Sequence, residues 1–338
     1  MQSELPLVNQ EQLRMQQVHY NVLSKYAVSS EKRQNAAIVI LCRNSDIQGI
    51  SKTLKNFEAV FNHKFGYPYV FLNDKPFTKE FKQKITGLSL KGASEFGLIP
   101  TAHWSYPAWI DQEKAAECRK EMTSRKVLYA ESESYRHMCR FNSGFFFKHP
   151  LLLAYRYYWR IEPDVEFFCP IDYDPFAFMH KEGKTYGFTI ALGEIPETVP
   201  SLWDTTKQFM LQNTQTINFQ SNLLSFFTTP NSAQYNLCHF WSNFEIADME
   251  FWRSPAYSAY FEHLDKAGGF FYERWGDAPV HSLAVGMFLP KEKVHFFADI
   301  GYNHPPFQHC PSIAKCKCKV QNTFDWQRGS CLRRWLTL

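Results

Sequence analysis

The sequence lacks several features that would assign it to a common class of protein. Within its 338 residues no stretch approaches the roughly 20 apolar residues of a membrane span, and its start, MQSELPLVNQEQLRMQQ, contains no signal-peptide core. We therefore expect this chain to be soluble. No Pro-, Gly- or Ser-rich linker, block of like charges or internal repeat marks a boundary, which favours one large domain.

Motifs of two nucleotide-binding classes are missing as well. No GxGxxG follows the first predicted strand, which argues against dinucleotide binding of the dehydrogenase kind. No stripe of Lys and Arg indicates a nucleic-acid groove, so we expect no nucleic-acid partner. The formal net charge of +4 is compatible with a small anionic ligand such as a nucleotide. Aromatic residues make up 17% of the chain, which suits flat apolar faces for sugar rings but also suits a large core.

The nine cysteines are unevenly distributed along the chain. Four lie near the C-terminus and five are scattered: Cys310, Cys316, Cys318 and Cys331, against Cys42, Cys118, Cys139, Cys169 and Cys238. The crowded tail predicts disulfides and therefore an oxidising compartment. Zinc is the competing interpretation, but the tail has a CxC and no CxxC pair, which makes zinc the weaker one. An odd number of cysteines leaves at least one thiol free or intermolecular.

Residues 36–74 have the pattern of a strand, a helix and a second strand. AAIVILCRN at 36–44 predicts a buried strand, residues 46–62 place large apolar side chains at helical intervals, and YPYVFLND at 67–74 predicts the next strand. This order gives a parallel pair with a right-handed crossover. We expect an α/β fold in which helices flank a mixed, mostly parallel central sheet, preceded by a polar helix over residues 8–33.

An acidic tripeptide, Glu162-Pro163-Asp164, interrupts a long aromatic and apolar run. Residues 155–161 predict a buried strand that the proline ends, and a carboxylate is costly to bury unless a cation or hydrogen-bond donors compensate it. Open α/β sheets bind nucleotides beyond their strand ends, and hard divalent cations prefer oxygen ligands. The tripeptide therefore predicts a metal site of the kind that nucleotide-sugar transferases use.

The alternative for this tripeptide is structural. Glu162 would then form an ion pair with Arg160 or Arg156, and Asp164 would cap a turn. A second acidic pattern, Asp172 and Asp174 in IDYD, imitates a D-x-D motif, and we interpret it as shaping a loop.

Several long segments together resemble the fungal Golgi α-1,2-mannosyltransferases. They include AAIVILCRN, ESESYRHMCRFNSGFFFKHP, YYWRIEPDVEFFCPIDYDPF, NLCHFWSNFEIADMEFWRSP, ERWGDAPVHS, GYNHPPF and the CKC tail, and the resemblance runs from about residue 36 to the C-terminus. It implies a GT-A fold, GDP-mannose as donor, Mn²⁺ as cofactor, a mannosylated glycoprotein or oligosaccharide as acceptor, and retention of anomeric configuration.

The resemblance also implies a cellular context. In that family a cytoplasmic tail, a membrane anchor and a stem precede a catalytic domain in the Golgi lumen, as in a type II membrane protein. We therefore expect residues 1–35 to be a helical, stem-like segment, with tail and anchor absent here, and residues 36–338 to be the catalytic domain with its Cys-rich tail.

Matched to the family's motifs, Glu162 and His304 are the expected metal ligands, and Mn²⁺ accepts both oxygen and imidazole. Asp164 completes an E-P-D that stands in for the usual D-x-D, with direct or water-mediated contact to the metal. The alternative for His304 is a loop histidine before two prolines.

Glu245, in WSNFEIADMEF, matches the family's candidate nucleophile. Apolar neighbours such as Phe240 and Phe244 predict a poorly solvated carboxylate that attacks the anomeric carbon or stabilises an oxocarbenium ion. The alternative is an acid on a helix surface, the kind expected for Asp248 and Glu250.

The remaining candidates come from the same motifs. Tyr135 matches a tyrosine near the nucleotide and the transferred sugar, and Asp277 an aspartate important for activity, with a turn residue before Pro279 as alternative. Arg160 is expected to meet an acceptor hydroxyl or to pair with Glu162. Four further residues are expected at the nucleotide: Arg43, Asn73, Asp74 and Arg140, the last as a bidentate phosphate ligand or a core-edge arginine.

The sequence thus predicts a retaining α-1,2-mannosyltransferase. The first alternative is a retaining mannoside hydrolase that uses two carboxylates, such as Glu162 and Glu245, and needs no nucleotide. The second is a catalytically silent mannan-binding protein built on a transferase fold, because a fold does not fix a function.

Overall fold

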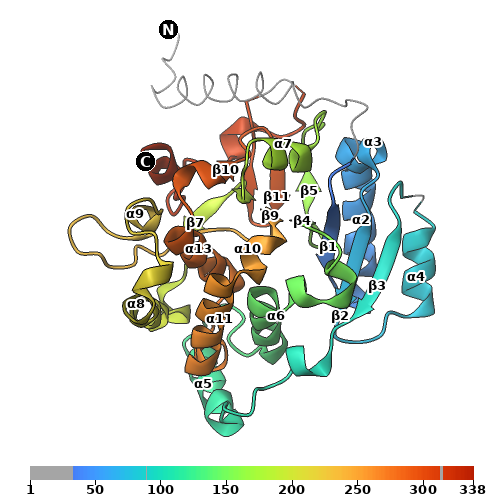
Figure 1. Cartoon of the computed structure of the whole chain (residues 1–338). Helices are drawn as coiled ribbons and strands as arrows, with labels where there is room; N and C mark the ends of the chain where they lie inside the picture. The colour runs from blue at the N-terminus through green and yellow to red at the C-terminus, as the bar shows by residue number, and fades with distance from the viewer. Residues whose placement is uncertain (1–32, 89, 313–314) are drawn as a thin grey trace.

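A computed structural model describes residues 33–88, 90–312 and 315–338 of the chain (Figure 1). Its centre is a seven-stranded sheet in the order β10-β6-β9-β4-β1-β2-β3. The strands are β1 (Ala36–Leu41), β2 (Tyr69–Asn73), β3 (Ser94–Leu98), β4 (Tyr157–Arg160), β6 (Tyr186–Phe188), β9 (Glu245–Asp248) and β10 (Val294–Phe296). Only β9 runs antiparallel to its neighbours in this sheet, so the mixed, mostly parallel arrangement is confirmed.

Helices cover both faces of this sheet (Figure 1). The α-helices are α2 (Ile47–Phe57), α3 (His63–Phe65), α4 (Lys79–Thr86), α5 (Gln112–Ser124), α6 (Glu133–Gly144), α7 (Pro175–Lys181), α8 (Leu202–Gln212), α9 (Leu224–Phe227), α10 (Met249–Arg253), α11 (Pro255–Ala267), α12 (Gly269–Tyr272), α13 (Asp277–Phe288) and α14 (Leu332–Leu336). One core layer holds α2, α4 and α7, and the other holds α6, α11 and α13. Alternation along β4 serves both layers, because Trp159 packs into the first and Tyr158 into the second.

The predicted strand–helix–strand start is confirmed with small shifts at its ends. The first strand stops at Leu41, the helix begins at Ile47, and after Phe57 the chain continues through a π-helical turn, Glu58–Asn62. Gly66, at φ +66°, then ends α3 in the left-handed region that glycine tolerates. The expected helix over residues 8–33 and the stem-like segment 1–35 lie almost wholly outside the described residues.

Two small sheets lie beside the main one. β5 (Glu166–Phe167), β11 (Tyr302–His304) and β12 (Phe307–His309) form an antiparallel sheet in the order β12-β11-β5. β7 (Ala191–Gly193) pairs with β8 (Cys238–Phe240). The pairing of β11 with β5 matters for the site described below. Because β5 follows Glu162 closely in the sequence, this pairing brings the end of β11, which carries His304, close to Glu162.

Three disulfides confirm the prediction for the cysteine-rich tail. They join Cys169 to Cys316, Cys238 to Cys331 and Cys310 to Cys318. Two tail cysteines thus pair with cysteines that the sequence left among the scattered ones, and the free thiols are Cys42, Cys118 and Cys139. Among the helices of residues 33–88, 90–312 and 315–338, none is both long and apolar enough to cross a membrane.

Candidate active site

The predicted site residues gather at one edge of the sheet because of strand direction. β1, β2 and β4 are parallel, so the residues after their last positions, Arg43, Asp74 and Glu162, leave the sheet at the same edge. β9 is antiparallel to β4 with Arg160 opposite Glu245, so β9 begins where β4 ends. Residues opposite each other in an antiparallel pair point to the same face. The strands thus bring Arg160 and Glu245 together.

The two oxygens of Glu162 face different partners. Oε1 accepts hydrogen bonds from Nε and Nη2 of Arg160, the first at 3.0 Å, whereas Oε2 lies 3.4 Å from Nε2 of His304. Burial alone would raise the pKa of Glu162, but the charge of Arg160 and the hydrogen bond with His304 lower it to about 2. Glu162 therefore stays ionised, and the ion pair with Arg160 that the sequence offered as an alternative is present.

His304 presents one defined nitrogen to Glu162. Its Nδ1 lies 3.0 Å from the carbonyl oxygen of Pro305, and a carbonyl only accepts, so Nδ1 carries a proton. In the neutral ring, Nε2 then has a lone pair directed at the side of Glu162, the arrangement found in metal-binding histidines. The ring of Trp241 contacts His304 edge to face at 4.8 Å between centroids and limits its rotation. Burial opposes the imidazolium, but the hydrogen bond to Glu162 and its charge raise the pKa of His304.

Glu162 and His304 fit a divalent metal that takes both oxygen and nitrogen. Within the described part of the chain, no three or more His, Cys, Asp or Glu side chains lie close enough to form a complete metal site. Two protein ligands are typical where phosphate oxygens and water complete the coordination of a metal. The geometry thus suits a metal that binds together with a diphosphate.

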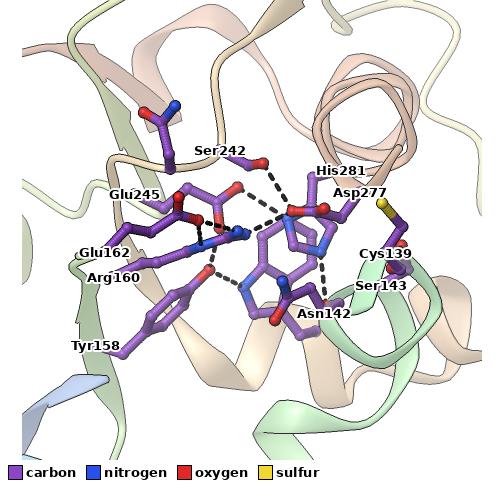
Figure 2. A network of polar contacts seen from close by, with 12 residues as sticks. Cys139, Asn142, Ser143, Tyr158, Arg160, Glu162, Ser242, Glu245, Asp277 and His281 are labelled. Carbon is purple, nitrogen blue, oxygen red and sulfur yellow. Dashed lines mark hydrogen bonds and ion pairs between the residues drawn. The ribbon is translucent and has the colours of Figure 1, made fainter. Parts of the chain in front are cut away.

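Arg160 links the metal-binding pair to the start of α13. Its Nη1 donates to Oδ2 of Asp277 at 2.5 Å, and Ser242 Oγ donates to the same oxygen at 2.7 Å (Figure 2). Asp277 is the first residue of α13, where the partial positive charge of a helix N-terminus favours a carboxylate. The three charged side chains Glu162, Arg160 and Asp277 therefore form a chain of ion pairs along the edge of the sheet.

Glu245 lies in a polar cage rather than among apolar side chains alone. Its Oε2 accepts from the hydroxyl of Tyr158 at 2.7 Å, and its Oε1 lies 2.8 Å from Nδ1 of His281 (Figure 2). Oε1 also accepts from the hydroxyl of Tyr186 at 2.9 Å. The side chain is 1% exposed. A cavity of about 10 Å³ borders it, roughly the space for one water molecule, lined by Val39, Leu41, Asn142, Phe146, Tyr158, Arg160 and Glu245.

The segment around Glu245 corrects the helical alternative. Residues 245–248 are a strand, because their backbone pairs with both β4 and β6, and the helix begins only at Met249. Asp248 is not a helix-surface acid either. It caps α10 by accepting from the backbone N–H of Glu250 at 3.0 Å, and it forms an ion pair with Arg156 at 2.9 Å.

The sequence did not identify the three residues that hold Glu245. Tyr158 and Tyr186 are inconspicuous among many strand aromatics. His281 carried a signal, since it is the only basic residue of the largely apolar helix α13 and lies one turn after Asp277.

Tyr135 lies in an aromatic stack at the start of α6. Its ring stacks on that of Tyr129 with centroids 4.7 Å apart, and the guanidinium of Arg274 lies 5.1 Å from its centroid. Ser132 caps this end of α6 by accepting from the backbone N–H of Tyr135. Nearby, Arg43 donates to the hydroxyl of Ser134 at 2.6 Å, so the end of β1 and the start of α6 meet here.

Arg140 has a structural partner instead of an open position. Its Nε and Nη2 donate to the two carboxylate oxygens of Asp265 at 2.7 and 2.8 Å, and both side chains are buried. This bidentate ion pair joins α6 to α11 and occupies the face of the guanidinium that a phosphate would need. These contacts favour the core-edge alternative for Arg140 over the predicted phosphate contact.

Asp164 and the end of β2 occupy the same edge. Asp164 is exposed, has φ +61° and packs its carboxylate against Gly49 in the first turn of α2, where a Cβ would lie 2.5 Å from Oδ2. Asn73 is buried and Asp74 half-buried at the end of β2. Their contacts with metal or nucleotide stay predictions.

The IDYD acids shape structure, as predicted. Asp172 bridges Lys64 and Lys315, and Asp174 caps α7 through the backbone N–H groups of Phe176 and Ala177.

A carboxylate and a histidine at the carboxyl edge of a mostly parallel sheet, beside a caged acid, fit a glycosyltransferase that uses a nucleotide sugar. Comparison with known sequences agrees: residues 2–338 match the family described as glycolipid 2-alpha-mannosyltransferase, and the chain belongs to this family. It is therefore a mannosyltransferase, which favours the transferase over the hydrolase and the silent binding protein.

Two curated relatives illustrate the similarity. Glycolipid 2-alpha-mannosyltransferase 1 of Candida albicans is 53% identical over 309 residues, which cover 90% of this chain and 71% of that protein. Alpha-1,2 mannosyltransferase KTR1 of Saccharomyces cerevisiae is 50% identical over 312 residues, covering 90% and 79%.

Two solved structures share the fold. Core-mannan synthase A of Aspergillus fumigatus, in its Mn/GDP form, superposes with a TM-score of 0.84 at 46% identity, covering 88% of this chain and 82% of that one. The mannosyltransferase Ktr4p of S. cerevisiae, in complex with GDP, gives 0.86 at 36% identity, covering 96% and 91%.

Proposed function

We propose that this chain transfers a mannosyl residue from GDP-mannose to the 2-hydroxyl of a mannosyl acceptor and that Mn²⁺ bound by Glu162 and His304 is its cofactor. The observation that carries the proposal is the pairing of Glu162 Oε2 with Nε2 of His304 at 3.4 Å, with the other nitrogen of the ring committed to a backbone carbonyl. Support comes from the similar structures, whose descriptions name Mn and GDP in one case and GDP in the other.

Several polar groups of the site have a task in this reaction. Mn²⁺ bound there supplies positive charge next to the departing diphosphate, the main electrostatic demand of the step. Arg160 holds Glu162 in place through Nε and Nη2, and its contact with Asp277 fixes the guanidinium at the sheet edge. We expect an acceptor hydroxyl to meet the guanidinium there. Tyr135 and Arg43 line the edge on the α6 side, where the nucleotide and the donor sugar are expected.

Glu245 stabilises positive charge in this proposal. Mannose is α-linked in GDP-mannose, so an α-linked product means retention, reached through a covalent nucleophile or by front-face attack. Both oxygens of Glu245 accept hydrogen bonds and its side chain is 1% exposed. Covalent attack would withdraw electron density from these hydrogen bonds and would require a caged oxygen to reach the anomeric carbon, whereas electrostatic stabilisation of an oxocarbenium ion leaves the cage as it is. The structure therefore favours the stabilising role.

We further propose a mannosylated glycoprotein or oligosaccharide as acceptor and the Golgi lumen as the place of action, in a full-length type II membrane protein. The relatives are named for glycolipid and O-glycoside mannosyl transfer. Three disulfides fit an oxidising compartment of the secretory pathway.

A donor screen tests the proposal. GDP-mannose, UDP-glucose and UDP-galactose are each incubated with methyl α-mannoside, with Mn²⁺ and with EDTA, and the products are identified by NMR. We expect an α-1,2-linked dimannoside from GDP-mannose alone, and only with the metal. Transfer that is equal in EDTA, or mannoside hydrolysis without transfer, would contradict the proposal.

A further inference from the structure

His281 is a completely buried histidine with both ring nitrogens engaged. It belongs to α13 and is 0% exposed, with Nδ1 at 2.8 Å from Glu245 Oε1 and Nε2 at 3.1 Å from the backbone oxygen of Asn142 (Figure 2). Its ring stacks on that of Trp252 with centroids 4.2 Å apart. Nothing in the reaction as described above uses this residue, although it touches the caged acid directly.

The contacts fix the number of protons in the pair. The carbonyl of Asn142 only accepts, so Nε2 of His281 carries a proton. The contact between Nδ1 and Glu245 at 2.8 Å also needs a proton, because two lone pairs would repel at that distance. Glu245 and His281 together therefore hold one proton more than a carboxylate beside a neutral imidazole.

The neighbours indicate that this proton belongs to His281. Tyr158 accepts from the indole N–H of Trp252 at 3.1 Å and so directs its own proton to Glu245, and Tyr186 donates as well. A carboxyl group that receives three hydrogen bonds is stabilised in its ionised form. The indole face of Trp252 favours a cation above it. An imidazolium beside a carboxylate also makes the buried pair neutral overall, which removes most of the cost of burying either charge.

The other groups that face this pair leave its charge balance intact. Tyr158 on β4, Tyr186 on β6, Trp252 on α10 and Tyr257 on α11 are uncharged. Arg160, Asp277 and Glu162 are the nearby charges, and the guanidinium of Arg160 forms ion pairs with both of these acids. The counter-charge of Glu245 is therefore His281.

We propose that His281 is a positioning residue for mannosyl transfer, which as an imidazolium orients Glu245 and keeps it ionised. The inference rests on the proposed stabilising role of Glu245. A charge that supports an oxocarbenium ion is effective only if the acid stays deprotonated while buried, and His281 supplies the cation that makes this possible.

Replacing the ring by an uncharged amide tests the proposal. In His281→Gln, the buried carboxylate loses the cation that compensates its charge, which favours its protonated form. We expect kcat to fall on the order of 10- to 100-fold, as when residues that orient reacting groups are removed, with GDP affinity in Mn²⁺ unchanged. The ratio of variant to wild-type kcat should rise with pH, because a higher pH favours the ionised form of Glu245. A ratio independent of pH would overturn the proposal.

His309 offers a matched control. It is also 0% exposed, with Nδ1 at 2.8 Å from Asp325 and Nε2 at 3.1 Å from the backbone oxygen of Ala298. His309→Gln removes an equivalent buried histidine outside the proposed site, so its kcat ratio, corrected for the folded fraction, should not change with pH. A pH-dependent ratio in this control as well would assign the His281 effect to general destabilisation.

Neutron diffraction from crystals of the unmodified chain keeps the proposal testable if the variant fails to fold. We expect hydrogen or deuterium on both ring nitrogens of His281 and none on Glu245. A proton on Glu245 facing a bare Nδ1 would overturn the proposal. This result does not depend on transfer, so absence of mannosyl transfer together with a doubly protonated His281 would overturn the proposed function and leave the assignment of charges in place.

Discussion

Glu245→Gln is the substitution that separates chemistry from binding at this site. The amide keeps the volume of the side chain but removes the charge, and it places an N–H group against one of three contacts, Tyr158, Tyr186 or His281. Loss of one preorganised electrostatic contribution typically lowers kcat by about 10² to 10³. GDP affinity is expected to stay unchanged because it depends on Glu162 and His304.

The assay measures kcat for transfer from GDP-mannose to methyl α-mannoside and, separately, the Kd of GDP by calorimetry. Asp248→Asn is the matched control, since Asp248 is an 8% exposed acid at the other end of the same strand. Asn caps a helix about as well as Asp, so the replacement removes mainly the ion pair with the half-exposed Arg156, which is worth about 0.2 to 1 kcal/mol, and it should leave kcat unchanged.

Two outcomes would refute this reasoning for Glu245. Near-normal turnover would exclude it as nucleophile and as stabiliser, and a loss of GDP affinity as large as the loss of kcat would assign it to binding. A glycosyl-enzyme adduct on Glu245, trapped with a slow fluorinated donor and detected by intact mass, would contradict the stabilising role in favour of covalent attack.

Three further predictions concern stability and architecture. Peptide mapping without reduction should find the three disulfides. Loop-closure entropy predicts that breaking Cys169–Cys316, which spans 147 residues, lowers the free energy of unfolding by roughly 5 kcal/mol, and that breaking Cys310–Cys318, which spans 8, lowers it by about 2.5 kcal/mol. Equal losses of stability would contradict this prediction. Burial disfavours the imidazolium of His309, but the negative charge of Asp325 outweighs burial and raises the pKa of His309 above 6.5. The ion pair therefore contributes its full stabilisation of the fold below pH 6.5 and loses it as the pH rises through the raised pKa. His309→Gln should therefore lower the free energy of unfolding more at pH 6 than at pH 9, and a loss that grows with pH would reverse the sign. Arg140→Met should cost about 3 to 5 kcal/mol of stability because it leaves Asp265 unpaired, and GDP affinity should stay unchanged. Weaker GDP binding by this variant would support a contact between Arg140 and phosphate instead.

The sequence predicts those parts of the molecule that depend on local pattern. The strand–helix–strand start follows from apolar spacing within residues 36–74, and the edge of the sheet follows from strand direction, which is why Glu162 and Arg43 are found at one edge. Periodicity also suffices for the strand before Glu162, since Tyr157–Arg160 is confirmed within the predicted 155–161.

The cage around Glu245 depends on contacts that local pattern does not contain. Tyr158, Tyr186 and His281 are 87, 59 and 36 residues away from it in sequence. The strand of residues 245–248 itself forms only because β4 and β6 lie on either side, and its composition is compatible with a helix. The sequence did not show the partner of Arg140 for the same reason, because Asp265 is 125 residues away.

Calorimetric titration of GDP into the wild type, Glu162→Gln and His304→Ala, each with Mn²⁺ and with EDTA, tests the central claim most directly. We predict that Mn²⁺ strengthens GDP binding to the wild type, that both variants lose most of this gain, and that all three chains bind GDP equally weakly in EDTA. Equal weakening of the variants with and without the metal would contradict the claim that Glu162 and His304 hold it.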